Sequence, residues 1–566
     1  RTPILSYALN ISPKNHFMAG IAVVVDREQK VIGVITDGDI RRGISKGVSL
    51  EEPVERIANF NPLLINATHS RAQIRKDLME EARRRKSHYF KYNKLILVEP
   101  DGKLRDVIPL SDVLSPPVEE KVLAIYGMGY VGLTLAATFA NAGIPVIGID
   151  VSEPLIAQLN RGTAPFYEKG LDSLLSSLAQ SNPIRFTIDA RLYPADVHIV
   201  TVGSPVLADG APDLSYVESA TRTIAAILKR EDLVIFRSTV PVGTMRRIVL
   251  PILEKSGLAC GADFRLVFAP ERTVEGKALD ELRSLPQIIG GFDKASTDMA
   301  GTLFGQITNT IVEVESLEAA ELVKLMNNTF RDLVFSFANE VAQICDAYNL
   351  NAFALVHAAN EGYPRDRIPL PSPGVGGICL SKDPYIYTHP IDPLPKAPVL
   401  GVASRSINRT GADYVIGKLQ TFCARTGKSL DSLRILVLGL AFKGTPETSD
   451  IRGSVALDLI EKLPVRKNIL VKDYVVTQAQ IEALGCTAVG NDLAAVFSEV
   501  DAVAVMNNHY LNNRFNFVQA LRRRNGPVLL FDGWNMFDQR EIENLPGAYY
   551  ATMGYMTAAP KPDRTK

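Results

Sequence analysis

The sequence predicts an α/β fold in which two doubly wound domains are joined by a central long-helix domain and preceded by a smaller α+β domain. Short apolar β-runs alternate with helical stretches from residue 122 to about 314 and again from residue 434. This alternation is typical of parallel sheets covered by helices. Between the two series, residues 316–350 contain neither Pro nor Gly and repeat apolar residues at helical spacing. The length of 566 residues suits three or four domains.

An internal repeat occupies the first 114 residues. The segment IAVVVDREQKVIGVITDGDI, which begins at Ile21, aligns with KLILVEPDGKLRDVIPLSDV, which begins at Lys94. Each copy has two β-runs around an acidic turn and then an Asp that opens a helix, so we expect two similar halves. The first copy is short at its front, and the chain begins at Arg1 rather than Met. From this we expect a truncated N-terminus.

A linker is expected at Ser115-Pro116-Pro117, and a long uncharged stretch follows it. Residues 122–149 carry no charge and are long enough to cross a bilayer. Glycines and Pro145 interrupt them, however. The stretch therefore predicts a strand, a glycine turn, a buried helix and a second strand, and no membrane span.

The glycine turn has the spacing GxGxxG, with glycines at positions 127, 129 and 132. Such a turn lets a pyrophosphate approach a helix N-terminus. Asp150 lies 18 residues after Gly132, near the spacing expected for a carboxylate on the ribose hydroxyls. Because a carboxylate repels a 2′-phosphate, we expect a Rossmann-like domain that binds NAD rather than NADP. The alternative is a nucleotide-free glycine turn.

Composition argues against several classes of partner. The net charge is zero, which disfavours nucleic acid or an anionic membrane. The five cysteines are scattered and form no CxxC, and the seven histidines form no HExxH. We therefore expect no metal site and a reducing, cytoplasmic location.

The segment GVGGICLSKD, from Gly374 to Asp383, places a cysteine in a glycine-rich turn. Glycines let a ligand approach Cys379 closely, and a helix that starts just after the turn would favour its thiolate. Asp383, four residues on, would share a helical face with Cys379. The segment indicates covalent catalysis, with a buried structural cysteine as the alternative.

Polar residues elsewhere fit the same site. Lys324 and Asn328 are four residues apart on the long helix, so they share a face and can hold a substrate oxygen. The alternative is that the two polar residues mark the solvent-exposed edge of the helix. Thr239 and Glu271 follow expected strands, where ligands of open α/β sheets bind. Glu271 is a candidate base or water-holder, with a surface ion pair to Arg272 as the alternative.

Ordered motifs in residues 120–556 resemble those of the nucleotide-sugar dehydrogenases that act on UDP-glucose or UDP-N-acetylmannosamine. Besides the GxGxxG turn and Asp150, they are LNRGTAPFYEKGL, PDLSYV, STVPVGT, APER, AAELVKLMNN, GVGGICLSKDP and LGLAFKGTPETSDIRGS. The resemblance implies a four-electron oxidation of the C6 alcohol of a UDP-sugar to the uronate, with two NAD reduced, in polysaccharide precursor synthesis. The GVGGxC form favours UDP-N-acetylmannosamine or UDP-N-acetylglucosamine.

The resemblance also implies a role for each matching residue. Cys379 is implied as the nucleophile, which forms a thiohemiacetal and then a thioester. The groups implied to manage the alkoxide and the hydrolytic water are Lys324, Asn328, Asp383, Glu271 and Thr239. The implied cofactor contacts are Gly127, Gly129, Tyr130, Val131, Gly132, Asp150, Thr239, Lys443 and Arg452. The implied substrate contacts are Glu271, Lys324, Asn328, Arg367 (or Arg365) of a neighbouring subunit, Gly374, Gly376 and Gly377 through their amides, Arg405 and Lys443.

The repeat of the first 114 residues resembles a pair of CBS domains, which implies an adenine nucleotide as a regulatory ligand. Thr36 and Asp39 match the motif that binds the nucleotide ribose. In the second copy Pro109 replaces the Thr while Asp112 is retained, so we expect at most one good site.

Two positions depart from the pattern of the dehydrogenases. Ile378 stands where N-acetylmannosamine enzymes often have His, and Trp534 stands where an Arg that helps hold substrate or cofactor is common. A homodimer or higher homo-oligomer is expected through the central helix. The expected domains are a CBS pair over residues 1–114, an NAD-binding domain over 120–314, a central helical domain over 315–428, a UDP-binding Rossmann-like domain over 429–557, and a disordered tail over 558–566.

Two alternatives to this function remain. A two-electron β-hydroxyacid dehydrogenase also joins a Rossmann domain to a helical domain with Lys and Asn, but it needs neither Cys379 nor a second βα domain. A non-catalytic nucleotide-sensing regulator is the other alternative, and the intact set of polar residues around Cys379 argues against it.

Overall fold

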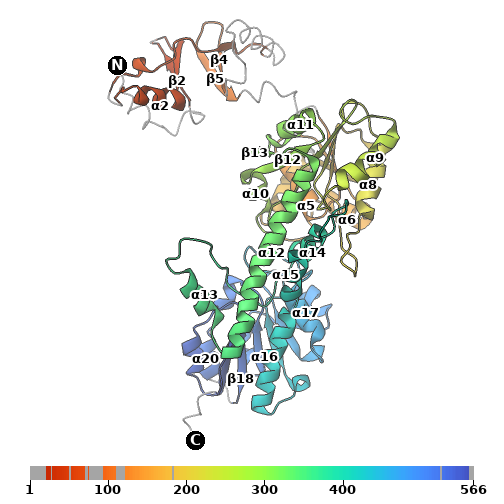
Figure 1. The fold of residues 1–566 in the computed structure, drawn as a ribbon, viewed down its shortest axis with the longest axis vertical. Helices are drawn as coiled ribbons and strands as arrows, with labels where there is room; N and C mark the ends of the chain where they lie inside the picture. The colour runs from red at the N-terminus through yellow and green to blue at the C-terminus, as the bar shows by residue number, and fades with distance from the viewer. Residues whose placement is uncertain are drawn as a thin grey trace. The chain divides into compact units, whose positions relative to one another are not determined.

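The computed structural model describes residues 21–26, 28–49, 52–69, 74, 94–109, 121–181, 184–522 and 526–559. The chain divides into two compact units, Arg1–Val118 and Glu119–Lys566, both drawn in Figure 1. The division falls directly after the predicted linker at residues 115–117. Asp112 and the end of the predicted tail, from residue 560, lie outside the described residues.

In the first unit, two hairpins repeat the same geometry. β1 (Ile21–Val25) pairs antiparallel with β2 (Val31–Thr36), and β4 (Lys94–Val98) pairs antiparallel with β5 (Leu104–Pro109). The bulges lie at residues 24/25 and 97/98, which are equivalent positions of the sequence repeat. β3 (Leu64–Asn66) pairs in parallel with β4, and α2 (Asp37–Ser45) follows β2. The sequence repeat therefore corresponds to a repeated hairpin.

The second unit begins with an eight-stranded sheet of order β13-β12-β11-β10-β9-β6-β7-β8. Neighbouring strands are parallel except β11 and β12. The order reverses between β6 and β9, where ligands of such sheets bind outside the carboxyl ends of the strands. The strands are β6 (Leu123–Tyr126), β7 (Val146–Ile149), β8 (Ile184–Thr187), β9 (Val197–Val200), β10 (Leu233–Phe236), β11 (Arg265–Phe268), β12 (Gln287–Gly291) and β13 (Ile311–Glu313).

Seven α-helices among the described residues accompany this sheet: α5 (Tyr130–Asn141), α6 (Glu153–Asn160), α7 (Leu171–Ser181), α8 (Ser215–Ala225), α9 (Leu250–Leu253), α10 (Ala278–Ser284) and α11 (Lys294–Phe304). The uncharged stretch 122–149 forms β6, α5 and β7, as predicted. Its strands and most of α5 are buried because both faces of a parallel sheet are covered. Within the described residues, no helix has both the length and the apolar character that crossing a membrane requires.

The predicted long helix is α12 (Leu317–Tyr348), a single helix of 32 residues that runs from the first sheet towards the second (Figure 1). The Ser316 hydroxyl caps its start, and Asn349 ends it in a left-handed conformation with φ 53°. One side packs against α14 and α15. Its other side leaves large apolar side chains exposed: Leu322, Met326, Phe330, Phe337, Ile344 and Tyr348.

Four helices follow α12: α13 (Ala352–Asn360), α14 (Ile378–Tyr387), α15 (Leu400–Asn408) and α16 (Gly411–Thr426). The chain turns between α15 and α16 where Gly411 packs against the Pro373 carbonyl. A Cβ atom at this position would lie 2.0 Å from that oxygen. This contact brings the start of α16 against the segment that leads into the Cys379 turn.

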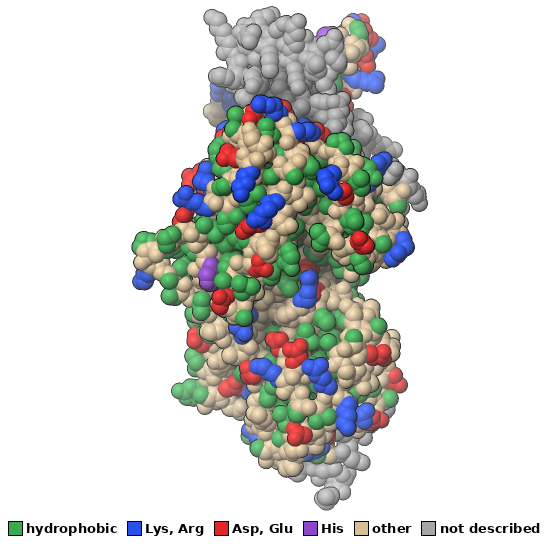
Figure 2. Space-filling model, turned by 90° about the vertical axis from the view of Figure 1, so that its right-hand side faces the viewer, with side chains coloured by type: hydrophobic (Ala, Val, Ile, Leu, Met, Phe, Trp, Pro, Cys, Tyr) green, Lys and Arg blue, Asp and Glu red, His purple; other side chains and the backbone are tan. Residues whose placement is uncertain are grey.

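The C-terminal part is a seven-stranded sheet of order β16-β15-β14-β17-β18-β19-β20, whose order reverses between β14 and β17. Its strands are β14 (Ile435–Leu438), β15 (Ile469–Lys472), β16 (Thr487–Ala488), β17 (Ala502–Val505), β18 (Val528–Asp532), β19 (Ala548–Thr552) and β20 (Tyr555–Met556). Its helices are α17 (Val455–Lys462), α18 (Gln478–Glu482), α19 (Leu493–Phe497), α20 (Phe517–Arg522) and α21 (Gln539–Glu543). On the face shown in Figure 2, basic and acidic side chains are interspersed, in keeping with the zero net charge.

Candidate active site

The GxGxxG turn joins β6 to α5 in the geometry that a dinucleotide requires. Gly127 has φ 93°, and a Cβ atom on Gly132 would lie 1.8 Å from the Gly127 carbonyl oxygen, so glycine is needed at both positions. Gly129 caps α5 without a side-chain hydrogen bond, and a Cβ atom there would meet nothing within 4 Å. The first amides of α5 therefore face open space, which fits a pyrophosphate.

Asp150 lies just beyond β7, beside this turn. Its carboxylate accepts hydrogen bonds from the Met128 amide (2.7 Å) and the Ser152 amide (3.0 Å). These bonds fix a carboxylate at the place where the ribose hydroxyls of a dinucleotide bind. Tyr130 and Val131 are the first two residues of α5. The Tyr130 hydroxyl donates a hydrogen bond to the Glu168 carboxylate rather than pointing to the dinucleotide site.

Cys379 is the second residue of α14, as the glycine turn predicted, and its side chain is exposed. The prediction of a favoured thiolate is wrong. The protein atoms that crowd the thiol on its inner side raise its pKa, and the Asp383 carboxylate raises the pKa further, while Lys324 and Lys382 act in the opposite direction. The pKa of the exposed Cys379 thiol is therefore raised above its ordinary value.

The residues predicted to surround Cys379 are brought together there. The Asn328 side chain donates a 2.6 Å hydrogen bond to the Asp383 carboxylate, and the Lys382 ammonium lies 2.8 Å from the same group. Asp383 is fully buried, and Lys324 is 9% exposed. The long helix and α14 therefore present a lysine, an amide and a carboxylate beside a single thiol.

Glu271 does not form the surface ion pair with Arg272 that was the alternative. It is buried, and its carboxylate accepts a charged hydrogen bond from Arg237 and two 2.7 Å hydrogen bonds from the amides of Arg272 and Thr273. Burial acts to raise its pKa, but Arg237 and the Thr273 amide outweigh burial, and the net pKa is lowered. Glu271 is therefore a permanent anion that can hold water or a cation but is a poor base.

The glycines of the Cys379 turn serve close packing more than ligand binding. The Gly374 amide donates to the Ser372 carbonyl (2.7 Å), and the Gly377 amide donates to the Gly453 carbonyl (3.2 Å). A Cβ atom on Gly376 would lie 2.5 Å from that same carbonyl oxygen. The prediction that the amides of Gly374 and Gly377 face the substrate is therefore wrong, because protein carbonyls already accept from them.

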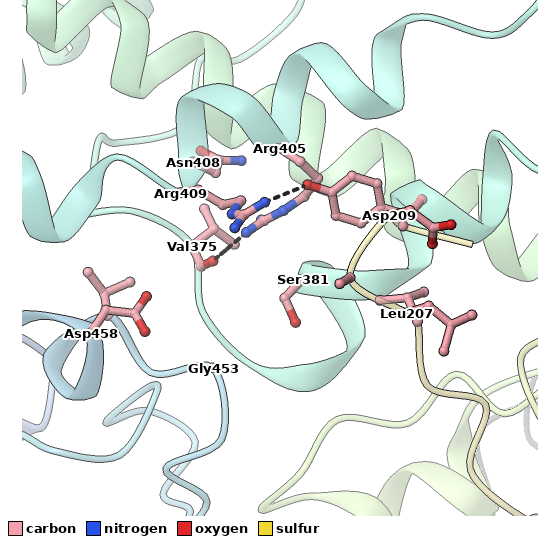
Figure 3. A pocket seen from close by; sticks show the side chains of 14 residues that line it. Leu207, Asp209, Val375, Ser381, Arg405, Asn408, Arg409, Gly453 and Asp458 are labelled. Carbon is pink, nitrogen blue, oxygen red and sulfur yellow. Dashed lines mark hydrogen bonds between the residues drawn. The ribbon is translucent and has the colours of Figure 1, made fainter. Parts of the chain in front are cut away.

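A cavity of about 500 Å³ opens beside the turn, and Figure 3 shows its lining. Ser381 and Tyr385 line it from α14. Ser381 comes two residues after Cys379, and two residues turn an α-helix by about 200°, so the cavity lies on another side of α14 from Cys379. The predicted substrate residue Arg405 also lines it. Its guanidinium, however, is held by the Asp332 carboxylate at 2.7 Å and by the Val375 carbonyl at 3.4 Å, so in this structure Arg405 supports the turn.

The structure also gives the positions of four further predicted site residues. Lys443 follows β14 and donates to the Glu275 carbonyl at 2.6 Å. Arg452 pairs with Asp450, which is the main cause of its raised pKa, and Cys379 adds to the effect. Thr239 follows β10 and is half-buried, and its carbonyl accepts from Ser204. Arg367 is exposed in the segment after α13.

In the first unit, Thr36 and Asp39 are joined to each other. The Asp39 carboxylate accepts from the Thr36 hydroxyl (2.6 Å) and amide (2.9 Å), and the Thr36 hydroxyl accepts from the Asp39 amide. This reciprocal pair caps α2 and orients both side chains at a helix N-terminus.

Sequence reasoning missed Arg237 and Asp332, which hold Glu271 and Arg405 in place. Both are buried, at 3% and 0% exposure. A signal exists for Arg237, because a charged residue directly after the apolar strand LVIF needs a buried partner. Nothing local marks Asp332, whose partners lie more than 70 residues away on α15.

Three segments of the chain match one protein family. Residues 121–308 match the NAD binding domain of the UDP-glucose/GDP-mannose dehydrogenase family, residues 318–409 its central domain, and residues 436–539 its UDP binding domain. Residues 14–46 match the CBS domain.

Individual proteins show the same likeness. The chain is 35% identical over 340 residues to the UDP-N-acetyl-D-mannosamine dehydrogenase of Pyrococcus horikoshii, covering 60% of this chain and 80% of that protein. It is 30% identical over 404 residues to the NDP-N-acetyl-D-galactosaminuronic acid dehydrogenase of Ralstonia nicotianae, covering 69% and 92%. The solved structure of UDP-D-ManNAc dehydrogenase from Pyrococcus horikoshii matches with a TM-score of 0.68 at 30% identity, over 76% of this chain and 99% of that one.

Proposed function

The chain belongs to the UDP-glucose/GDP-mannose dehydrogenase family and is an NAD-dependent nucleotide-sugar dehydrogenase, and from this we propose that it oxidises the C6 alcohol of a UDP-N-acetylhexosamine to the uronate through Cys379. The observation that carries the proposal is the exposed Cys379 thiol beside Lys324 and the Asn328–Asp383 pair. A two-electron alcohol dehydrogenase has no use for a thiol at that place.

The α5 turn and Asp150 would hold NAD, one molecule for each of the two oxidations, and each molecule would supply the hydride acceptor. In the first, C6 loses a hydride and its hydroxyl loses a proton to water. Lys324 and Asn328 hold the oxygen as its negative charge develops. The lowered pKa of Glu271 keeps a carboxylate near Lys324 and so helps to hold the ammonium in place.

Cys379 then retains the aldehyde for the second oxidation. A bond forms between sulfur and C6, and the thiol proton ends on the former carbonyl oxygen, which gives a thiohemiacetal. Loss of a hydride from C6 and of that proton leaves a thioester. Water attacks C6, the C–S bond breaks, and the uronate leaves. The raised pKa of Cys379 favours the return of a proton to sulfur.

An N-acetylated sugar is supported by the relatives and by the turn before Cys379. Both of the relatives described above are named for N-acetylated hexosamines or their uronic acids. The resemblance also implies that the GVGGxC form of the turn favours that branch, although Ile378 replaces the His that N-acetylmannosamine enzymes often have.

Counting NADH per sugar tests this function. Purified protein with NAD is given UDP-N-acetylmannosamine, UDP-N-acetylglucosamine and UDP-glucose in turn. We expect one N-acetylated sugar to react and to yield two NADH for each sugar consumed, because both oxidations occur before release. One NADH per sugar would instead support the two-electron β-hydroxyacid dehydrogenase, and no turnover of any sugar would contradict the proposal.

The exposed side of α12 supports a homodimer. Large apolar side chains recur along it at spacings of four and seven residues, as in helices that pack along a shared seam. Phe330 is 64% exposed and Phe337 50%. We infer that two copies of the chain pair along this side, and that the exposed Arg367 reaches the substrate of the partner copy.

A charge placed in this seam tests the dimer. Phe330→Asp should convert the dimer to a monomer, because an isolated carboxylate cannot be buried between two apolar helices without large cost. Light scattering after size-exclusion chromatography measures the mass. Tyr216→Asp on α8 is the matched control, since Tyr216 is 58% exposed and lies outside the seam. A Phe330→Asp dimer would contradict the inference.

The first unit is proposed to bind an adenine nucleotide at Thr36 and Asp39. The support is the CBS match over residues 14–46 and the orientation of both side chains at the start of α2. Calorimetric titration with ATP, ADP and AMP should show at most one nucleotide per chain, and Asp39→Asn should weaken it about tenfold through loss of a charged hydrogen bond. Absence of binding by all three nucleotides would refute the site.

A further inference from the structure

One peptide group of the second unit is held on both of its sides. The peptide that joins Glu275 to Gly276 donates its N–H to the Tyr130 hydroxyl (2.9 Å) and to the Glu168 carboxylate (2.7 Å). Its carbonyl accepts from the Lys443 ammonium at 2.6 Å. Because a trans peptide is planar, its N–H and C=O point in opposite directions, and holding the first fixes the direction of the second.

The first side of this peptide belongs to the cofactor turn. Tyr130 is the first residue of α5, directly after Gly129. Its phenol donates to Glu168, and its ring packs against Phe166 with centroids 4.9 Å apart. Glu168 is 4% exposed and also accepts from the Ala278 amide at 2.9 Å. The turn that faces the pyrophosphate and the loop that carries Glu275 therefore form one hydrogen-bonded unit.

The other side of the peptide meets the UDP-binding sheet. Lys443 lies just after β14, and the Thr448 hydroxyl donates to the Glu275 carboxylate at 3.0 Å. Gly276 has φ 87°, and a Cβ atom there would lie 2.4 Å from the Glu447 carbonyl oxygen. The two loops thus approach each other more closely than any residue but glycine allows.

We propose that Tyr130 and Glu168 are positioning residues for the nucleotide half of the substrate. They orient the Glu275–Gly276 peptide so that its carbonyl holds the Lys443 ammonium at the diphosphate of UDP. Without them the peptide is free to turn, and Lys443 loses its anchor. Hydrogen bonds in series also polarise one another, which strengthens the carbonyl as an acceptor. The inference rests on the proposed function, because it takes a UDP-sugar as the ligand of Lys443.

Tyr130→Phe tests the inference, with UDP itself as the probe. This change deletes the hydroxyl and keeps the ring against Phe166. Calorimetric titration should show UDP bound about tenfold more weakly, as expected for the loss of a buried hydrogen bond, and NAD bound within twofold of wild type. Tyr126→Phe is the matched control. It removes a buried hydroxyl that lies 3.0 Å from His198 in the same domain, and it should leave UDP affinity unchanged.

A double variant separates positioning from a general loss of stability. If Tyr130 acts through Lys443, Tyr130→Phe in a Lys443→Met background should weaken UDP binding no further. With the sugar substrate, Tyr130→Phe alone should raise KM about tenfold and leave kcat within about threefold of wild type. Unchanged UDP affinity in Tyr130→Phe, or additive effects in the double variant, would overturn the inference. Failure of the wild-type protein to bind UDP would overturn the proposed function as well.

Discussion

Cys379→Ala is expected to lower uronate formation by about a thousandfold or more, because the aldehyde then has no covalent partner to hold it for the second oxidation. The first oxidation needs only the cofactor and the residues that hold the oxygen, so NADH should still appear slowly, at one per sugar or less. Mass spectrometry of the products and absorbance of NADH measure both effects. A hydroxylamine trap should capture the aldehyde that the variant releases.

NAD binding should be unaffected by this change, since the cofactor turn joins β6 to α5 and Asp150 follows β7, while Cys379 is the second residue of α14. Cys260→Ala provides the matched control. Cys260 is also a free cysteine, but it is half-buried near Asp293, and the variant should keep wild-type turnover. Steady uronate production by Cys379→Ala would remove the thiol from the mechanism.

Asn328→Asp is expected to lower kcat about a hundredfold at neutral pH, although the change is nearly isosteric. The Asn328 amide donates to the Asp383 carboxylate at 2.6 Å, and the variant would place two carboxylates at that distance. Two such groups cannot both ionise, so one of them keeps a proton to a raised pKa. The loss of a placed donor to the reacting oxygen costs about a hundredfold in comparable sites.

The pH profile distinguishes this mechanism from simple misfolding. Below the raised pKa the shared proton restores a donor between the two residues, and above it the donor is lost. The kcat of the variant should therefore fall as pH rises, by a step that is missing in the wild-type profile. Asn327→Asp, one residue earlier and exposed, makes the same change of charge and should leave kcat near the wild-type value. A flat profile for Asn328→Asp would count against a role for the pair.

Local pattern predicted the elements that carry the site. The GxGxxG spacing and the uncharged stretch around it predicted β6, α5 and β7, and helical periodicity without Pro or Gly predicted α12. The glycine turn before Cys379 predicted the start of α14 and its carboxylate neighbour. Each of these depends on residues a few positions apart, which the chain places relative to one another through backbone geometry alone.

Pairings between distant residues could not be predicted in the same way. The Arg237–Glu271 pair joins residues 34 apart, and Arg405 and Asp332 are 73 apart. The expected role of the Gly377 amide was wrong because this amide meets the Gly453 carbonyl from a distant segment, and the Arg405 guanidinium is held by Asp332 on α12. No spacing rule gives the angle at which two helices or two sheets meet, and that angle selects the partner.

Local periodicity and motifs in a fixed order were enough to predict the family, the cofactor turn, the long helix and a cysteine in the first turn of α14. Only the packed chain showed the raised pKa of Cys379, the lowered pKa of Glu271 and the peptide bridge from Tyr130 to Lys443. The physical reason is that charge states and hydrogen-bond partners depend on burial and on groups from other elements, which only the packed chain brings within a few ångströms.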